Sequence, residues 1–452
     1  MKNFKIIYLI ILVGLVSVSC TKFLDIKPDE KMVVPNSLDD CDALLDDRNT
    51  MNSRYPVAGE VASDNYYLMD ANYTAITNIV ERDTYIWAPN TNFSTNQWSS
   101  SYKVALVANQ VLALLVKTNR SVDAERYDRL KGEALFFRAY AWSQLAPVFT
   151  LPYSPISASK TLGLALRENP TIDYPSVRSD LETTYKQIIT DLNAAVLLLP
   201  ENSIYKTRPT KLAIWATLSR IGLIISDFQL AESSAKKVIN YGVELLDYNG
   251  VNKNLSNPFG RFNKEVLFHA STLTSTCLSP SISKVDSTLY RSYLPNDLRR
   301  SIYFKNNNNG TYEFKGRYDG DINASCFAGI ALDEIYFNYA EALAQNNKLN
   351  QALAVFNKLM LSRWVKDTYL PFTSNNQADI LAKIRDERRK SLIMRNLRWS
   401  DIRRWNSGDQ KIKLKRILSG SVYELNAGDL RFAFLIPTTV MEYAPEIIQN
   451  KR

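Results

Sequence analysis

Apolar residues recur along much of this chain at alternating spacings of three and four, the repeat of a helix with one buried face. In the stretch 177–199 these positions are Val177, Leu181, Tyr185, Ile188, Leu192, Val196 and Leu199. Pro200 then ends the helix. The pattern resumes over 208–225 and, after Asp227, over 230–239. The sequence therefore predicts a helix followed by a helix–turn–helix pair.

The same pattern recurs as two further pairs. The four helices that it predicts span 98–116, 127–148, 332–343 and 349–360. Small residues such as Ala134, Ala340 and Ala352 allow paired helices to approach closely. We therefore predict a mainly α fold with little β structure, built from tetratricopeptide-like helix pairs. Their irregular spacing excludes a strict array with the usual repeat of about 34 residues.

Two long inserts between the helices have a different composition. Residues 50–97 and 242–330 show little helical period and are rich in aromatic and asparagine residues. Loops carried on a rigid scaffold are where recognition usually occurs. We therefore expect the two inserts to present the ligand-binding surface.

The first twenty residues have the features of an export leader that ends at a lipid-attachment cysteine. The apolar run Ile6–Val18 follows two lysines, and one small residue separates it from Cys20. Its thirteen residues fall short of the roughly 20 that a membrane-spanning helix needs. Leu15–Cys20 resembles the bacterial lipobox, so we predict that residues 1–19 are a signal peptide and that Cys20 is acylated. An uncleaved anchor helix and a plain secretory leader remain the alternatives.

The charge pattern argues against nucleic-acid binding. The chain holds 55 Lys and Arg residues against 46 Asp and Glu. Loss of the leader removes Lys2 and Lys5, which lowers the formal charge from +9 to +7. Both signs alternate along the chain instead of gathering in one basic patch or tail. We therefore expect no nucleic-acid partner.

The cysteines do not form a complete disulfide framework. Beyond Cys20 the chain holds Cys41, Cys277 and Cys326, an odd number without a Cys-x-x-Cys pair. Small buried thiols are the preferred interpretation. A bridge between Cys277 and Cys326 is the alternative.

Several segments, in order, resemble the SusD/RagB family of surface lipoproteins from Bacteroidetes-type bacteria. The matching segments are Phe23–Asp25 with Pro28, Trp98–Gln110, Lys131–Tyr153, Thr207–Ser219, Asn263–Phe268, Asn338–Leu343, Glu387–Arg389, Arg398–Trp405, Ile436–Pro437 and Gln449–Asn450. Each is weak alone, but together they extend nearly from end to end. The chain departs from the family at Met394–Asn396, where an acidic residue is usual.

The resemblance implies four tetratricopeptide-like helix pairs that support a loop-rich ligand surface within one domain, 20–452. It also implies a partner, a SusC-type TonB-dependent outer-membrane barrel, over which the lipoprotein acts as a hinged lid. The expected function is capture of oligosaccharide or peptide nutrients at the cell exterior, with the protein lipid-anchored to the outer membrane. Oligosaccharide is preferred, because the inserts favour Tyr, Trp and Asn over a charged clamp.

Sugar binding needs rings that stack on C–H faces and polar groups that meet hydroxyls. The inserts supply both. The predicted ligand-binding residues are Asp64, Tyr66, Tyr67, Arg82, Trp87, Asn92 and Phe93 from the first insert, and Tyr290, Tyr293, Tyr312 and Tyr318 from the second. For each ring taken singly, packing of a loop onto the helices is the alternative.

The arginine-rich stretch 385–404 is interpreted as structural. Guanidinium groups suit phosphate oxygens, but Asp386, Glu387 and Asp401 stand among them. We therefore predict internal ion pairs that hold the last helices together.

The stretch 319–323 begins like a calcium loop, with Asp319, Asp321 and Asn323. Ala324 and Ile330 occupy the positions where an EF-hand needs glycine and glutamate. We expect no EF-hand, no metal and no other cofactor, although another calcium geometry stays open.

Catalysis is not expected from this sequence. His269 is the single histidine, and Glu265–Ala270 has the pattern of a buried strand. The chain contains no Gly-x-Ser-x-Gly, His-Glu-x-x-His or glycine-rich phosphate loop. The alternatives to nutrient capture are a tetratricopeptide-like scaffold for envelope proteins and, with less support, a surface glycosidase, which needs only two carboxylates.

Overall fold

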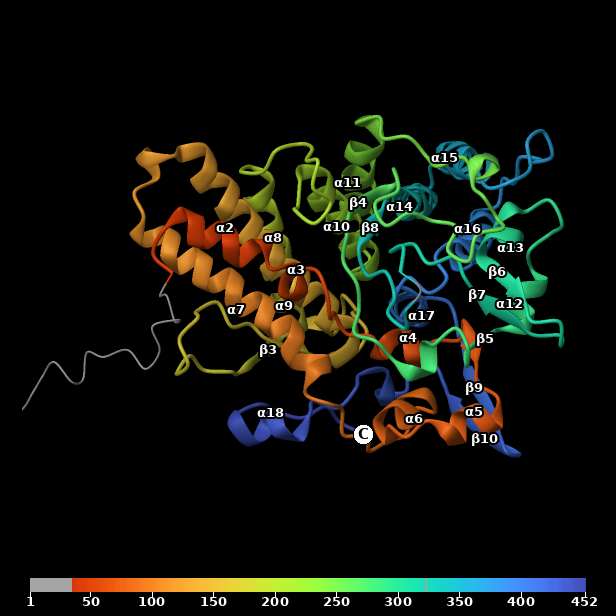
Figure 1. The fold of residues 1–452 in the computed structure, drawn as a ribbon, viewed down its shortest axis with the longest axis horizontal. Helices are drawn as coiled ribbons and strands as arrows, with labels where there is room; N and C mark the ends of the chain where they lie inside the picture. Colours follow the sequence, from red (N-terminus) through yellow and green to blue (C-terminus); the bar gives the residue numbers. More distant parts are fainter. Residues whose placement is uncertain (1–34, 322) are drawn as a thin grey trace, which may run out of the picture.

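The helices predicted from periodicity are present in the computed structural model, which describes residues 35–321 and 323–452. Helices hold 49% of the residues and strands 9%, which confirms the mainly α fold. The scaffold helices are α2 (Leu38–Asp46), α7 (Asn96–Lys117), α8 (Ala124–Phe149), α9 (Leu181–Val196), α10 (Lys211–Ile224), α11 (Phe228–Asn240), α14 (Leu332–Gln345), α15 (Leu349–Leu361), α16 (Gln377–Ser391) and α17 (Arg398–Asn406). Successive members such as α7 and α8, α10 and α11, and α14 and α15 pack side by side (Figure 1). The predicted lipidation site, Cys20, lies outside the described residues.

Polar caps determine where these helices begin. Ser37 and Asp40 form a reciprocal capping box at α2, and Thr210 caps α10. Asp180 accepts a hydrogen bond from the backbone N–H of Thr183 at 2.8 Å and so starts α9. Val177, predicted inside this helix, lies before it, because Arg178–Asp180 pairs as strand β3 with β2 (Leu162–Ala165).

The main hydrophobic core lies between the scaffold helices and includes residues near both ends of the described chain, from Cys41 to Ile447. At its centre the Phe268 ring packs edge-on against Phe136 and Tyr140, with ring centroids 4.9 and 5.1 Å apart. α7 is long and apolar enough to cross a membrane, but it buries Val104 and Val111 in this core, as a helix of a globular protein does.

The two inserts pack on each other and form a second hydrophobic core. The first contains α3 (Arg48–Met51), α4 (Ala58–Ala62), β1 (Tyr66–Tyr67), α5 (Asp70–Ala75) and α6 (Ile79–Tyr85). The second contains β4 (Val266–Phe268), β5 (Lys284–Val285), α12 (Ser287–Arg291), α13 (Leu298–Tyr303), β6 (Phe304–Asn306), β7 (Tyr312–Phe314) and the start of β8 (Ile330–Ala331). Tyrosine and phenylalanine rings from both inserts fill the space between these short elements. The irregular segments are therefore packed structure with a core of their own.

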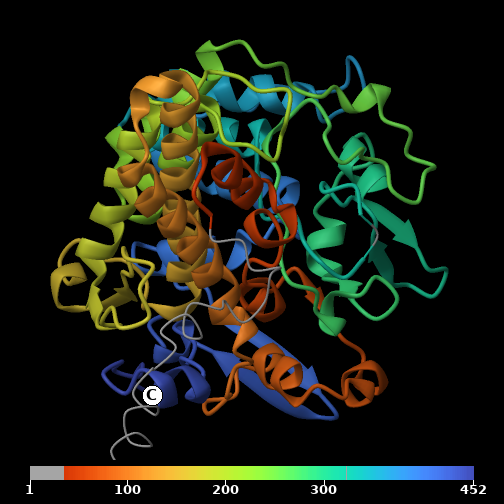
Figure 2. The same cartoon turned by 60° about the vertical axis from the view of Figure 1, so that its left-hand side comes forward.

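Strands in the described residues pair only as two-stranded antiparallel sheets. β1 pairs with β5 and so joins the two inserts, while β4 pairs with β8. β9 (Leu414–Leu418) and β10 (Ser421–Leu425) form a hairpin that the sequence analysis did not predict. Its turn residues, Ser419 and Gly420, both have positive φ, as a two-residue type I′ turn requires. The hairpin lies beside α5 and α6 (Figure 2), and α18 (Thr438–Tyr443) follows it.

The arginines of α16 and α17 form buried ion pairs, as predicted. Arg404 donates two hydrogen bonds of 2.7 Å to the Glu341 carboxylate of α14. Arg388 donates to Asp401 at 2.8 Å, which joins α16 to α17. Arg398 reaches the first insert and binds Asp64 through two hydrogen bonds of 2.7 and 2.8 Å. A buried charge is tolerated only when it is paired, so these contacts determine how the last helices dock.

Similar arginine–carboxylate pairs occur at other junctions of the scaffold. The pairs are Arg138 with Asp191, Arg220 with Glu334, Arg299 with Asp297 and Glu387, Arg363 with Glu265, and Arg395 with Asp333. Each of these guanidinium groups is at least nine-tenths buried.

Replacing Arg404 should destabilise the fold strongly. Arg404→Met leaves the fully buried Glu341 carboxylate without its bidentate partner, which should lower the free energy of unfolding by about 3–5 kcal/mol. The control, Arg120→Met, breaks an ion pair whose arginine is 60% exposed and should cost less than about 1 kcal/mol. Urea denaturation at pH 7 measures the free energy of unfolding of both variants. Equal losses of stability in the two variants would contradict the conclusion that Arg404 and Glu341 form a stabilising buried ion pair.

The same contact makes stability depend on pH. Burial alone would raise the pKa of Glu341, but the Arg404 guanidinium lowers it from 4.5 to about 2. Because the pKa is lower in the folded state, the ion pair stabilises the fold above pH 4.5, and this stabilisation disappears as the pH falls towards 2. The advantage of the unmodified protein over Glu341→Gln should therefore shrink by up to about 3 kcal/mol over this range.

Urea denaturation between pH 2 and pH 7 measures this difference. Glu182→Gln is the control, because Glu182 forms an ion pair with Lys186 that is 71% exposed at the lysine. Its effect should stay below about 1 kcal/mol throughout. A difference for Glu341→Gln that stays constant with pH would be incompatible with the lowered pKa.

Candidate functional site

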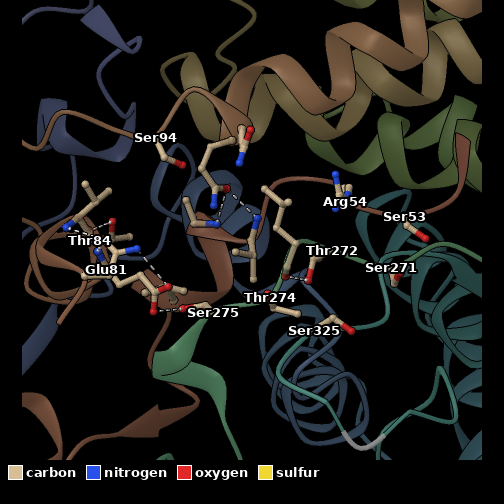
Figure 3. Close-up of a pocket in the computed structure, with 18 of the residues that line it drawn as sticks. Ser53, Arg54, Glu81, Thr84, Ser94, Ser271, Thr272, Thr274, Ser275 and Ser325 are labelled. Carbon is tan, nitrogen blue, oxygen red and sulfur yellow. Dashed lines mark hydrogen bonds between the residues drawn. The ribbon is translucent and has the colours of Figure 1, made fainter. Parts of the chain in front are cut away.

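A polar pocket of about 540 Å³ opens where the two inserts meet (Figure 3). One wall comes from residues 49–61 and another from 78–97 of the first insert. The third wall comes from 271–275 and from 321–325, of which residue 322 is not described, in the second insert. Concave sites at the junction of packed units are the usual location of ligand binding.

Hydrogen bonds between the inserts hold the first wall in place. The backbone N–H of Tyr55 donates to Ser271 O at 3.1 Å, and Leu273 N–H donates back to Tyr55 O at 2.8 Å. The side-chain amide of Asn52 donates to the carbonyl oxygens of Thr207 and His269, both at 2.9 Å. The segment 52–55 is thereby fixed against 269–273. This second segment directly follows β4, the buried strand that the sequence pattern predicted.

The second wall, residues 78–97, begins with α6, and Asn78 caps this helix. The Glu81 carboxylate of this helix accepts hydrogen bonds from Ser275 Oγ at 2.9 Å and from Cys277 N–H at 3.2 Å. Gln97, at the start of α7, accepts from the backbone N–H groups of Val57 and Ala58 at 3.0 and 3.3 Å. Each wall of the pocket is therefore bonded to at least one other.

The lining suits a ligand with many hydroxyl groups. Ser53, Ser94, Ser271 and Thr274 present hydroxyls to the pocket, as Figure 3 shows, and asparagines supply amides. Arg54 and Glu81 add a cationic and an anionic group on different walls (Figure 3), and Asp321 adds a second anionic group. Such groups can exchange hydrogen bonds with a polar ligand, whereas the described lining offers little aromatic surface.

A second groove, of about 700 Å³, lies between α7, α18 and the loop 165–176. Trp98 and Tyr102 stack in its wall with ring centroids 4.7 Å apart, and Tyr443 stands at its edge. The polar groups nearby bond to the protein itself: Tyr102 donates to Ala165 O and the Asn109 amide donates to Arg167 O. This groove is mainly apolar and fits a polyol less well than the pocket between the inserts.

Five predicted ligand-binding rings are core side chains, and the prediction is corrected for them. Tyr66, Trp87, Phe93, Tyr293 and Tyr318 are each no more than 3% exposed. Trp87 Nε1 donates to Ala62 O at 3.0 Å, and Tyr293 OH donates to Lys390 O at 2.8 Å. Phe93 borders the pocket but packs against Phe434, with ring centroids 4.7 Å apart. These rings fill the cores, because the short elements of the inserts need bulky apolar groups between them.

Asp64 is also committed to the fold. Burial would raise the pKa of this carboxyl, but Arg398 and Arg389 hold it well below its usual range. The carboxylate thus bridges the first insert to α16 and α17 and is partly buried.

The remaining predicted residues are partly or fully exposed but do not converge on one point. Tyr67 lies on β1 opposite Lys284 of β5, Arg82 lies on α6, and Asn92 accepts a hydrogen bond from Thr438 N–H. Tyr290 and Tyr312 come together, with their rings stacked at a centroid distance of 3.4 Å. Of the eleven predicted residues, these two form a pair and Phe93 borders the pocket.

The hydroxyl-rich run Ser271–Ser275, which is not among the predicted site residues, supplies much of the second insert's contribution to the pocket. A run of serines and threonines directly after a buried strand is a usable signal, because such residues stand at the edge of a packed core. Arg54 and Glu81 carried no motif that would have distinguished them.

The buried cysteines and Asp319 are committed to the fold. Cys41, Cys277 and Cys326 are free and buried, which agrees with the preferred interpretation and not with a bridge. Burial raises the pKa of Asp319 to about 6, and its carboxylate accepts from Asp321 N–H and Ser325 Oγ. Among the described residues, no three His, Cys, Asp or Glu side chains are grouped so that they could hold a metal ion.

Comparison with known proteins relates most of the chain to one family. A family model described as "Starch-binding associating with outer membrane" matches residues 22–223, and one described as "SusD family" matches residues 295–431. The SusD-like protein P2 of Formosa agariphila is 28% identical over 144 residues, which are 32% of this chain and 26% of that protein. That match thus spans about a quarter of the relative's length.

Solved structures share the fold over nearly the whole chain. A SusD superfamily protein from Bacteroides thetaiotaomicron has a TM-score of 0.73 at 22% identity, covering 92% of this chain and 100% of that one. A protein from Bacteroides vulgatus, described as a putative sugar binding protein, has a TM-score of 0.75 at 21% identity, covering 92% and 99%. The two family models together span most of the sequence, and the conclusion that follows is that the chain belongs to the SusD family, a family of non-catalytic binding proteins.

Proposed function

We propose that this protein captures oligosaccharide at the outside of the outer membrane and delivers it to a SusC-type TonB-dependent barrel as its lid. The polar pocket between the inserts is the proposed ligand site. The observation that carries this proposal is the pocket's lining of hydroxyl, amide and charged groups at the junction of the two inserts. The words "starch-binding" in the matching family model and "sugar binding" for the B. vulgatus neighbour support a glycan over a peptide.

The Tyr290–Tyr312 stack is the proposed second contact for a longer glycan. Both rings are partly exposed, and Arg300 lies over the Tyr290 ring at 5.2 Å. A ring face of this kind can stack on the C–H face of a sugar outside the pocket. Tyr67, Arg82 and Asn92 are retained as further surface contacts in this proposal.

Attachment through acyl chains on Cys20 is the proposed route to the membrane. The first family model's description associates its members with the outer membrane, which supports this location. At about 0.8 kcal/mol per buried CH₂, several acyl chains hold a protein essentially permanently. Metabolic labelling with palmitate should mark the protein, and replacing Cys20 with alanine should abolish the label and release the protein from membranes.

Filling the pocket should block ligand capture. We expect residues 21–452 to bind members of a glycan array and not of a matched peptide array. Thr274→Trp places a large ring at an exposed position of the lining and should weaken glycan binding more than about tenfold, because the ligand loses its space. Titration calorimetry with the best glycan of the array measures the change.

Thr276→Trp is the matched control, since Thr276 is also exposed but lies outside the lining. It should bind as the unmodified protein does. Equal glycan binding by the unmodified protein, Thr274→Trp and Thr276→Trp would mean that the ligand binds outside this pocket. Binding to members of the peptide array alone would overturn the proposal that the ligand is a glycan.

A further inference from the structure

The backbone at Arg54 is held in an unfavourable conformation at the edge of the pocket. Its φ of +67° lies in the left-handed region, which residues other than glycine and asparagine rarely adopt. The flanking contacts of Asn52 and Tyr55 with the second insert hold the chain in this position. Strained residues of this kind persist where the surrounding structure fixes them, and they concentrate at ligand sites.

The positive charge of Arg54 is not neutralised by any described residue. The side chain is exposed and forms no hydrogen bond or ion pair within the described part of the chain. It is the single Lys or Arg among the described residues of the lining. The guanidinium groups of Arg138, Arg220 and Arg388 in the scaffold, in contrast, are buried against carboxylates.

The acidic residues of the lining already have partners of their own. Asp321 forms an ion pair with Arg261, and the Glu81 carboxylate accepts hydrogen bonds from Ser275 and Cys277. Neither lies within ion-pair distance of Arg54. The pocket therefore combines one available guanidinium with walls of hydroxyl and amide groups (Figure 3).

We infer that the glycan taken by this pocket is acidic and that Arg54 binds its anionic group, a uronate carboxylate or a sulfate ester. This inference rests on the proposed function and specifies its ligand. A guanidinium binds such oxyanions through two parallel hydrogen bonds, and the hydroxyls around it meet the rest of the sugar. The formal charge of +7 that remains without the leader adds long-range attraction for an anionic polymer.

The test compares charged and neutralised forms of the same glycans. The probes are uronate oligosaccharides with their carboxyl-reduced counterparts, sulfated oligosaccharides with their desulfated counterparts, neutral maltooligosaccharides, and acidic peptides. Residues 21–452 should bind a uronate or a sulfated probe, and binding should fall when the probe is neutralised or when salt is raised. The pair of probes that responds identifies the anionic group.

Variants at two neighbouring arginines separate the specific contact from overall charge. Arg54→Gln should weaken binding of the acidic probe by about tenfold to a hundredfold, the range for a lost charge-assisted hydrogen bond. Arg54→Lys should bind the acidic probe with an affinity between those of the unmodified protein and Arg54→Gln, because lysine keeps the charge but lacks the planar guanidinium. Arg48→Gln removes the same charge from an exposed position outside the lining and should leave binding unchanged. Thermal melting verifies that the variants are folded.

The outcomes distinguish this inference from the proposed function. Binding of neutral glycans that Arg54→Gln leaves unchanged would overturn the acidic ligand but leave glycan capture standing. Equal losses for Arg48→Gln and Arg54→Gln would reduce the effect to overall charge and so contradict the role of Arg54. Binding of acidic peptides alone, or of no glycan in the panel, would overturn both.

Discussion

The structure depends on arginines that are buried against carboxylates. Arg404 with Glu341 and Arg388 with Asp401 join the last helices to the scaffold, and Arg398 with Asp64 joins them to the first insert. Apolar packing alone is tolerant of shifts, but a buried guanidinium needs its partner at a defined distance and angle. These pairs therefore determine which elements meet, and so they position the inserts that form the pocket.

The second hydrophobic core explains why the candidate pocket is polar. Short helices and two-stranded sheets cannot bury a core with aliphatic residues on regular faces, so large rings such as Tyr66 and Tyr318 fill the space between them. Since most rings face inwards, the surface where the inserts meet is left to hydroxyl and amide groups. Recognition there relies on hydrogen bonds and charge more than on stacking.

The scaffold could be predicted from the sequence and the site largely could not. Helical periodicity identified the pairs α7 with α8, α10 with α11 and α14 with α15, because the period of 3.6 shows which face of a helix is buried, but it did not identify α16 and α17. It placed the start of α9 too early, since the cap at Asp180 and the pairing of β3 decide that boundary. The inserts have no such period, so composition could not separate the buried Tyr293 from the partly exposed Tyr290. The pocket residues, Arg54 among them, meet only in three dimensions.

The contact between Asp64 and Arg398 spans 334 positions of the chain. An insert that closes on a residue so distant cannot be completed while the polypeptide is still emerging, whatever its local preferences are. Folds dominated by such remote contacts form slowly, because the entropy of closing the loop is lost before the contact contributes. Docking of the first insert onto α17 therefore follows synthesis of the C-terminal helices.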